Sequence, residues 1–380
     1  MIAITFYKRE KYKQKILIDR LCLLQFFLIY HMMKAYERNK RFNKEPEPLL
    51  GGIRLDTGTH VVMGIALGGL ATLDPVVAQD AVHFHSVLIA TVLGSQAPDI
   101  DTLLKFKNNA VYIRNHRGIT HSLPAVLLWP LAITAVLSIF FPGTDALHLW
   151  LWSFLAVFLH VFVDIFNAYG TQALRPFSYK WVALGVINTF DPFIFTIHVI
   201  GIAAWLFGAQ PGPTFLAMYI FIFLYYIARF AARHDVKKAV LARIPDAERI
   251  IISPTIHFHQ WKIAVRTKDA YYVAFAFKSA VTILDKFKRL PVPENKILEV
   301  AKQDKNLSAF LSFSPVYNWQ IKELDNGWEV RFTDLRYRKN GHYPFVAVVK
   351  LNEDLEIIGS YTGWIFNKEK LKKKLDIVPR

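Results

Sequence analysis

The sequence predicts a mainly α-helical fold: a polytopic membrane helix bundle of about six spans, followed by a cytoplasmic α+β domain. Three observations predict it, namely an apolar composition, a segregated charge and long apolar runs in the middle of the chain. Of the 380 residues, 53% are hydrophobic and only 20% are charged, and the mean hydropathy is +0.25. This composition excludes a disordered or fibrous chain and disfavours a wholly soluble globular protein.

The basic charge is concentrated at the two ends of the chain. Residues 1–54 carry 12 Lys and Arg against 5 Asp and Glu, residues 55–228 carry 6 against 8, and residues 229–380 carry 28 against 17. Basic segments beside a nearly charge-free middle are typical of cytoplasmic regions that flank an anionic membrane leaflet. We therefore expect a basic N-terminal extension at residues 1–54, a membrane-embedded domain at residues 55–234 and a basic cytoplasmic α+β domain at residues 235–380.

Six apolar runs in the middle third are candidates for membrane spans, because crossing about 30 Å of hydrocarbon takes roughly 20 residues. They occupy approximately residues 60–79, 82–97, 122–141, 147–168, 186–207 and 213–231. The first two runs are short, rich in glycine and interrupted by Asp74 and Pro75. A bundle of four spans is therefore the alternative.

The positions of the basic residues predict the topology of this bundle. Between residues 55 and 228, every basic residue lies in one of two loops, 98–121 and 169–185: Lys105, Lys107, Arg114, Arg117, Arg175 and Lys180. Because positively charged loops stay on the cytoplasmic side, six spans place both loops and both termini in the cytoplasm. The expected location is the bacterial cell (inner) membrane, which the chain crosses several times.

Residues 1–54 fit this scheme poorly. Their apolar stretch contains Asp19 and Arg20, and no small-residue cleavage site follows it. The Gly-Gly-Ile-Arg segment before Leu55 is what a purine-rich ribosome-binding site would encode. We therefore hypothesise that translation starts at Leu55 and that residues 1–54 are a mis-called start.

Polar motifs occur at the span ends that face the two basic loops. They are Thr59-His60, Ala97-Pro98-Asp99-Ile100-Asp101, Asn115 to Ser122, His160 to Asp164, and a weaker Phe190-Asp191-Pro192. Ionisable residues inside a membrane are costly unless they are paired or coordinated, so their gathering at one face indicates a site. The single Cys22 excludes a zinc site made of thiolates, and a metal has to be held by His and carboxylate.

The spacing within these motifs suits a divalent cation. His160 and Asp164 are four residues apart and project from the same stripe of a helix. Asp99 and Asp101 follow a helix-ending proline, as suits a loop that holds a cation. We predict one or two divalent ions, Zn²⁺ or Mn²⁺. The predicted pool of ligands is His60, Asp99, Asp101, His121, His160 and Asp164.

Taken singly, several of these residues also have a local explanation. His60 could cap a helix or lie at the membrane interface, and Asp99 could be a solvated residue at a helix end. His116 could be an ordinary loop residue beside Arg117. Asp191, which precedes a proline, is more typical of a helix start than of a ligand.

The linked motifs resemble those of the YdjM-type integral membrane metal-dependent hydrolase family, also described as LexA-binding, inner-membrane-associated hydrolases. The residues that carry the resemblance are His60, PDID at 98–101, HRGITHS at 116–122 and the His and Asp of HxxxD at 160–164. The segment LDTGTHVVMGIALGGLATLDPVVA is similar to the YfhP-like branch. The resemblance covers roughly residues 55–235, and it implies a multi-pass membrane protein with metal-dependent hydrolase activity.

The leading functional hypothesis is a hydrolase of an ester or phosphoester at the cytoplasmic membrane face. His116 is the expected general acid or base, and Arg117 the expected clamp on an anionic oxygen. Membrane lipids are expected partners, and a site near the headgroups favours a lipid-like ester substrate. The rival is a non-catalytic membrane regulator or sensor whose cytoplasmic domain contacts a DNA-bound repressor, a regulatory protein partner, or DNA. A metal transporter is disfavoured, because its ligands are expected near the midplane.

After Asp235 the pattern changes to alternating strands. They are expected at Ile256–Val265, Ala270–Phe277, Tyr317–Leu324, Trp328–Leu335, Phe345–Leu351 and Leu355–Phe366, with one helix at 293–304. Asn326-Gly327 is a hairpin turn signal between two of these strands. Aromatic and basic residues are frequent, but no RNP-type motif is present, so direct nucleic acid binding is not expected.

Overall fold

The structure is a computed structural model that describes residues 48–106, 108–366, 371 and 375. The chain divides into two compact units, with the boundary between Gly58 and Thr59. The hypothesis that residues 1–54 are a mis-called start concerns a segment that lies outside the described residues, except for the beginning of one helix.

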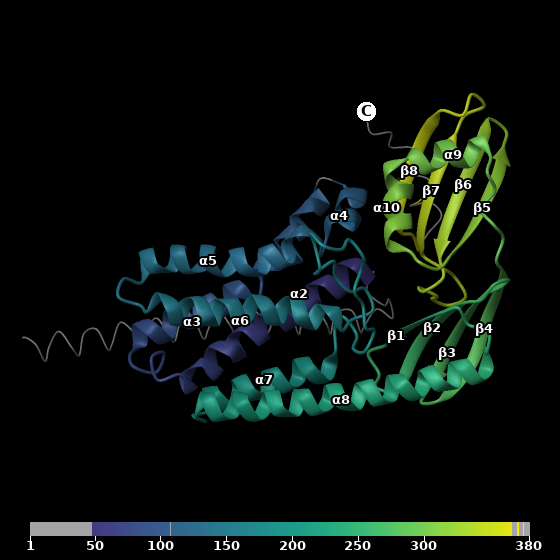
Figure 1. Ribbon diagram of the computed structural model, residues 1–380. Coiled ribbons are helices and arrows are strands. Elements are labelled where there is room, and N and C mark those ends of the chain that lie inside the picture. Colours follow the sequence, from purple (N-terminus) through teal and green to yellow (C-terminus); the bar gives the residue numbers. More distant parts are fainter. Residues whose placement is uncertain (1–47, 107, 367–370, 372–374, 376–380) are drawn as a thin grey trace, which may run out of the picture. The chain divides into compact units, whose positions relative to one another are not determined.

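The N-terminal part of the described chain is helical. Its α-helices are α2 Pro48–Leu70, α3 Ala81–Gly94, α4 Asn109–Asn115, α5 Leu123–Phe140, α6 Ala146–Ile165, α7 Pro192–Leu206 and α8 Pro211–Arg243. Three 3₁₀ helices lie between them: η1 Ala71–Leu73, η2 Ala97–Phe106 and η3 Ile119–His121. Helices α3, α5 and α6 pack on one another, and α7 packs on α8 (Figure 1).

Polar side chains cap the first turns of five of these helices. Backbone N–H groups in the first turns of α3, α4, α5, α6 and α7 donate to the side chains of Asp80, Asn108, Ser122, Asp145 and Asp191, in that order. Asp191 is thus a helix cap, and the span expected from residue 186 begins only at Pro192. The run expected to reach residue 79 ends as an α-helix at Leu70, and its last turn is the short η1.

Three of the described helices are long and apolar enough to cross a membrane, namely α5, α6 and α8. Helices α3 and α7 are apolar but shorter. Large apolar side chains point outward from the long helices, among them Leu128, Ile139 and Phe223, which are 62%, 77% and 65% exposed. Exposed apolar surface on this scale suits contact with lipid. A helical region with three candidate membrane helices is therefore established, and six spans remain a proposal.

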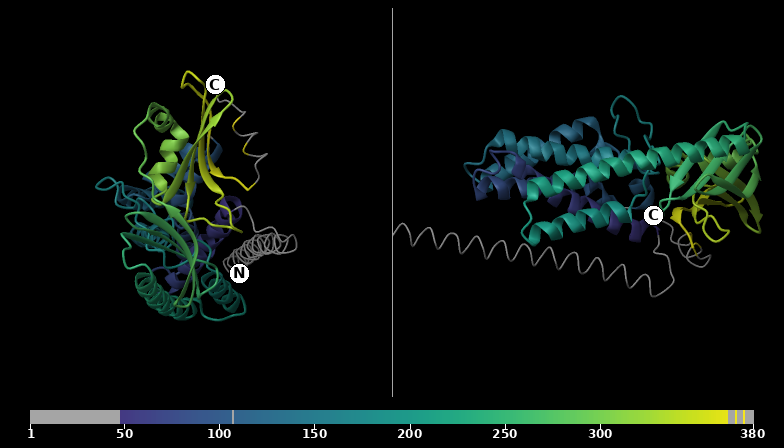
Figure 2. Two further views of the ribbon diagram at one scale, coloured as in Figure 1. Left: turned by 90° about the vertical axis from the view of Figure 1, so that its right-hand side faces the viewer. Right: turned by 90° about the horizontal axis from the view of Figure 1, so that it is seen from below.

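Helix α8 packs against two parts of the molecule and runs between them without a break (Figures 1 and 2). Its first half packs on α7, where Phe215 and Met218 enter a core with residues of α2. In its last turns Val236, Val240 and Ile244 pack against Trp261 of the first sheet. With 33 residues it is about 50 Å long, which exceeds the thickness of a bilayer core.

The C-terminal part contains two antiparallel sheets, each with four strands in sequence order. The first sheet is β1 Arg249–Pro254, β2 Gln260–Arg266, β3 Ala270–Phe277 and β4 Ala280–Lys288. The second is β5 Tyr317–Leu324, β6 Gly327–Asp334, β7 Phe345–Leu351 and β8 Ile357–Trp364. Helices α9 Lys296–Gln303 and α10 Lys305–Phe313 pack against the second sheet. An α/β region after the helices agrees with the expectation.

Several elements of this part differ from the sequence expectation. Strand β2 begins at Gln260 rather than at residue 256, because residues 255–259 form a turn in which the N–H of Gln260 bonds the carbonyl of His257. Strands β1 and β4 and helix α10 were not expected. Strand β4 is largely exposed along its whole length, so it lacks the alternation that marks a half-buried strand. Helix α10 begins after Asp304, which caps it.

Candidate metal centre

Four of the predicted ligands meet where three packed helices end. His160 and Asp164 lie in the last turns of α6, and His121 closes η3 immediately before α5. Asp99 lies in η2, just after α3. Because α3, α5 and α6 pack on one another, these ends are brought together. The four side chains each offer one ligand atom, and these atoms all lie within 4.8 Å of one another.

Five of the six separations between the four ligand atoms are 3.3–3.7 Å, and the sixth, between Asp99 and Asp164, is within 4.8 Å. His121 Nε2 lies 3.3 Å from both His160 Nε2 and Asp164 Oδ2. Asp99 Oδ1 lies 3.7 Å from the Nε2 atom of each histidine. His160 Nε2 lies 3.7 Å from Asp164 Oδ2. A tetrahedral zinc site with ligands at about 2.0–2.1 Å has edges of about 3.3–3.4 Å, so these separations leave room for one such ion.

The hydrogen bonds of the two histidines direct their Nε2 lone pairs into this space. His160 Nδ1 lies 2.7 Å from the carbonyl oxygen of Ser95, which can only accept, so the ring proton belongs on Nδ1. His121 Nδ1 lies 3.1 Å from Thr120 Oγ1, and that hydroxyl in turn donates to Asp101 at 2.6 Å. Holding the outer nitrogen of a ligand histidine in this way fixes its tautomer and ring orientation.

The carboxylate oxygens in the group also lack a donor. Asp99 Oδ1 and Asp164 Oδ2 are buried and have no hydrogen-bond partner among the described residues. The side chains of His121 and His160 are 0% exposed, that of Asp164 is 3% exposed and that of Asp99 is 12% exposed. Buried acceptors that face one another repel unless a cation lies between them. The donor set, two imidazoles and two carboxylates, therefore fits a divalent metal ion.

Asp101, also a predicted ligand, is occupied by protein donors. Its Oδ1 lies 2.7 Å from His116 Nδ1, and its Oδ2 accepts from the backbone N–H of Arg117 at 2.8 Å and from the hydroxyl of Thr120. Burial raises the pKa of Asp101, but its hydrogen bonds with His116 and Thr120 outweigh burial and hold the pKa below its ordinary value. A second group that could hold a cation consists of Asp99, Asp101 and His116. An ion there would compete with the groups that already donate to Asp101.

His116 lies at the edge of the centre. Its side chain is 20% exposed, and its ring stacks on that of Tyr112 with centroids 4.5 Å apart. Its centroid is 6.3 Å from that of His121. With Nδ1 on Asp101, the Nε2 atom is left for a reacting group. His116 therefore has the position and the carboxylate partner of a general acid or base.

Arg117 lies beside the carboxylate of Asp164. It is 3% exposed, and its Nη2 lies 3.1 Å from Asp164 Oδ1. Its φ is +57°, a left-handed conformation held by the N–H bond to Asp101 and by a bond from the N–H of Gln172 to its carbonyl. Its guanidinium therefore contacts the carboxylate of Asp164 in a buried position, and its role as a clamp on an anionic oxygen stays a prediction.

His60 lies beside the group of four ligands. Its Nε2 is 3.7 Å from Asp164 Oδ1, and its ring stacks on His160 with centroids 3.9 Å apart. Helix α2 starts well before this residue, so His60 lies inside a helix and does not open a span as expected. All the predicted site residues are thus near one another, and His60 and Asp101 contact the ligands rather than completing the tetrahedron.

Several polar groups of the helical region were assigned no role from the sequence. Thr120 Oγ1 and the carbonyl of Ser95 each contact the Nδ1 atom of one histidine of the candidate centre. At the opposite end of α6, Asp74 Oδ2 lies 2.6 Å from His148 Nδ1 and accepts from Trp152 Nε1 at 3.0 Å. The sequence spacing of these residues does not indicate their contacts. Asp74 and His148, for example, are far apart in the sequence and meet only because the helices pack together.

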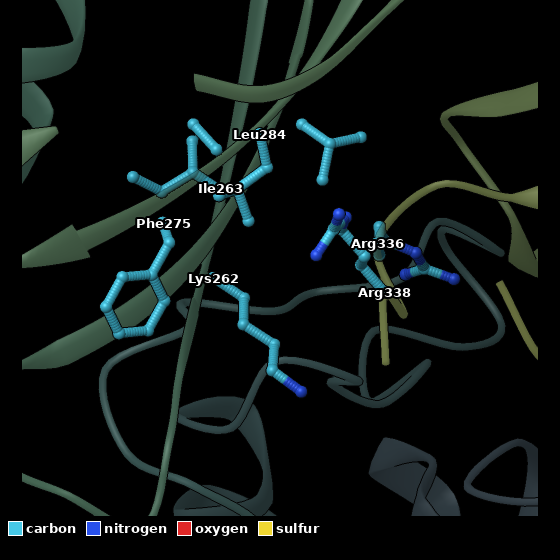
Figure 3. A pocket seen from close by; sticks show the side chains of 8 residues that line it. Lys262, Ile263, Phe275, Leu284, Arg336 and Arg338 are labelled. Atoms are coloured by element: carbon cyan, nitrogen blue, oxygen red, sulfur yellow. The ribbon is translucent and has the colours of Figure 1, made fainter. Parts of the chain in front are cut away.

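The C-terminal part also contains a cavity of about 160 Å³ between the first sheet and the segment after β6 (Figure 3). Its lining combines apolar side chains with Lys262, Arg336 and Arg338. Arg336 is bonded to Asp334, and Arg338 to Asp285. Since both guanidiniums are already paired with carboxylates, the cavity does not provide a strong site for an anion.

Comparison with known protein families accounts for nearly all of the described chain. Residues 55–236 match the family of the YdjM inner membrane protein. Residues 245–287 match the YfhP middle domain, and residues 296–375 match the YfhP C-terminal alpha/beta plait domain. The chain belongs to the YdjM family, in its YfhP-like form. The YdjM region contains every residue of the candidate metal centre.

Among relatives of this YdjM-family chain is the uncharacterized protein YfhP of Bacillus subtilis (strain 168). The two are 62% identical over 324 residues, which are 85% of this chain and 99% of the relative. No solved structure matches the chain. The resemblance inferred from the motifs at 60, 98–101, 116–122 and 160–164 is therefore confirmed at the level of the family.

Proposed function

We propose that the protein is a membrane-bound, metal-dependent hydrolase that cleaves an ester or phosphoester at the cytoplasmic membrane face. The metal part of the proposal is supported by the close approach of Asp99, His121, His160 and Asp164, in which Asp99 Oδ1 and Asp164 Oδ2 are buried without a hydrogen bond. The catalytic part is supported by the pair of His116 and Asp101 at the edge of this group. Separations of 3.3–3.7 Å favour a tetrahedral Zn²⁺ site over an octahedral Mn²⁺ site, because neighbouring ligands of an octahedral ion lie closer together. A bound Zn²⁺ supplies Lewis-acid activation of water and of the ester or phosphoryl group.

We propose one ion rather than two. A second ion held by Asp99, Asp101 and His116 would have to displace the N–H and O–H groups that already donate to Asp101. Those donors also orient His121 and His116, so their loss would disturb the first site. Asp101 is therefore assigned a positioning role, in which it holds His116 and, through Thr120, His121.

Side chains of this protein supply the proton transfers and the positioning that hydrolysis requires. His116 Nε2 accepts a proton from the attacking water and passes one to the leaving alcohol, while Asp101 stabilises the imidazolium. The water oxygen bonds to carbon or phosphorus, the ester C–O or P–O bond breaks, and the alcohol leaves with the proton. Arg117 holds Asp164 in place. Asp99 is the most exposed of the four ligands, so substrate approaches from its side.

We also propose an arrangement of the chain in the membrane. Helices α5, α6 and α8 cross the bilayer, and the shorter helices complete six spans with both termini in the cytoplasm. In this topology the metal centre lies at the cytoplasmic ends of the spans, close to the lipid headgroups. A lipid-like ester is then the nearest substrate.

One observation favours a second candidate function. Zinc sites with four protein ligands are more often structural than catalytic, since catalytic sites keep an open position. On this reading the protein is a non-catalytic membrane regulator or sensor, whose C-terminal region contacts a DNA-bound repressor or DNA. A transporter is less consistent, because the ligands lie at helix ends.

The test starts with the full-length protein purified from membranes. Elemental analysis counts the bound metal, and a panel of carboxylic and phosphoric esters is then assayed with Zn²⁺, Mn²⁺ and Mg²⁺. We expect turnover that is lost in Asp164→Asn and kept in Asp191→Asn, a buried aspartate outside the metal groups. Turnover no higher than that of Asp164→Asn across the panel would contradict the hydrolase and leave the regulator.

A further inference from the structure

The segment η2, which carries Asp99 and Asp101, has an unusual form. It is a 3₁₀ helix of ten residues, whereas runs of more than 3–4 residues are uncommon. In a 3₁₀ helix there are three residues per turn, so residues i and i+3 lie on the same side. Its side chains therefore form three straight stripes, each with its own surroundings.

The first stripe is buried and fixes the segment. It consists of Pro98, Asp101 and the half-buried Leu104. Asp101 accepts from the N–H of Arg117 and the hydroxyl of Thr120, which ties η2 to η3 and the start of α5. These bonds determine which way the other two stripes face.

The second stripe is apolar and exposed. Ile100, Leu103 and Phe106 are 50%, 61% and 91% exposed, so exposure rises with distance from the centre. The apolar surface continues on the neighbouring elements, since Ile119 of η3 is 67% exposed and Leu127 of α5 is 53% exposed. Because α5 is a candidate membrane helix, the stripe adjoins the surface that faces lipid.

The third stripe connects the ligands to a cation. It consists of Asp99, Thr102 and Lys105, all partly buried. Lys105 is six residues after Asp99, about 12 Å along the axis at 2.0 Å per residue. Its Nζ lies 4.5 Å from the centre of the Tyr112 ring, and Tyr112 stacks on His116. The third stripe thus carries the proposed ligand Asp99 and the ammonium group of Lys105. Lys105 is connected through Tyr112 to the proposed general base, His116.

We infer that η2 inserts its apolar stripe among the acyl chains and presents Lys105 to an anionic headgroup, so that the substrates are anionic membrane lipid esters. An apolar stripe with a flanking cation is the usual pattern of an interfacial anchor. The substrate class rests on the proposed function. The insertion of η2 does not, and it is tested separately.

Insertion is measured on the full chain in lipid nanodiscs. The single native Cys22 is changed to Ser, and a spin label is attached at Phe106→Cys. Its collision rates with oxygen, which enters bilayers, and with an aqueous nickel chelate are compared with those at Leu131→Cys and Phe277→Cys. These reference sites are similarly exposed, at 54% and 51%, on α5 and on β3. Behaviour like Leu131 supports insertion, and behaviour like Phe277 overturns it.

Headgroup recognition is measured by binding, so that it does not depend on turnover. The probes are a short-chain phosphatidylglycerol and the uncharged diacylglycerol with the same chains. We expect the wild-type protein to prefer the phosphatidylglycerol, and Lys105→Gln to reduce that preference about tenfold with the metal content unchanged. Lys237→Gln, an exposed lysine on α8, is the matched control. An unchanged preference in Lys105→Gln would refute the assignment, whereas an inactive wild-type protein would refute only the hydrolase.

Discussion

The guanidinium of Arg117 lies 3.1 Å from Oδ1 of Asp164, while the other oxygen of that carboxylate faces His121 at 3.3 Å. One aspartate therefore joins a buried cation to the candidate metal group. If the group binds an ion, Arg117 holds Oδ1 of this carboxylate while Oδ2 remains on the side of the two histidines. We therefore expect Arg117 to act as a positioning residue.

Arg117→Gln is expected to weaken metal binding by roughly 10–100-fold, the usual cost of losing a residue that orients a ligand. The measurement is competition for Zn²⁺ with a chromophoric chelator in detergent. Arg243→Gln, at the exposed end of α8, should bind like the wild type. If Arg117→Gln holds zinc as tightly as that control, Arg117 does not support the site.

Removal of a ligand should release the metal without preventing membrane insertion. Asp164→Asn and His121→Ala are expected to lose bound metal because each takes away one corner of the tetrahedron. Their matched controls are Asp191→Asn and His198→Ala, which change buried residues of the same type outside the metal groups. Elemental analysis after purification from membranes decides, and full stoichiometry in both ligand variants would remove these residues from the set.

The six-span topology makes a prediction about sidedness. Reporter fusions after Pro142 and Gly208 should score as external, and fusions after Asn108 and Lys180 as cytoplasmic, because the basic loops stay inside. Two reporters provide the internal control, since one is active only in the cytoplasm and the other only outside it. A cytoplasmic signal at Gly208 would contradict six spans, because the connection between α7 and α8 would then lie on the same side as the basic loops.

The last prediction concerns stability in the C-terminal region. Arg336 and Asp334 form a pair with side chains 7% and 0% exposed, so Arg336→Met leaves a buried, uncompensated carboxylate and should cost about 3–5 kcal/mol. Arg331→Met is the control, because Arg331 pairs with Glu329 two residues away but is 36% exposed. Its loss should cost below about 1 kcal/mol. Equal shifts of the thermal unfolding midpoint in the two variants would refute this difference.

The candidate site was partly predictable because helix spacing is a local property. His160 and Asp164 are four residues apart on α6, and any helix with that sequence places them together. Asp99 and Asp101 were predicted to share one role, but η2 has three residues per turn, and the two carboxylates face different neighbours. Whether the four ligand residues bind an ion stays a prediction.

The fold was predictable where the apolar pattern is strong and less so where packing decides. Helices α5 and α6 begin within one residue of the expected spans, since Ser122 and Asp145 cap them. The pattern of β4 could not show a strand, because most of its residues are exposed and its existence depends on pairing with β3. Such pairing is a long-range property that a local sequence window does not contain.

In the proposed six-span arrangement, helix α8 links the membrane region to the first sheet as one continuous helix. It has no proline after Pro213, and Arg229 clamps its middle to the carbonyls of Val186 and Phe258 while lying 4.2 Å from the Trp261 ring. Transmembrane helices tilt when the bilayer becomes thinner or thicker than their apolar length. Because α8 continues without a proline into the core of the first sheet, we expect a change in its tilt to move that sheet as well. Bilayer thickness would then act on the position of the first sheet.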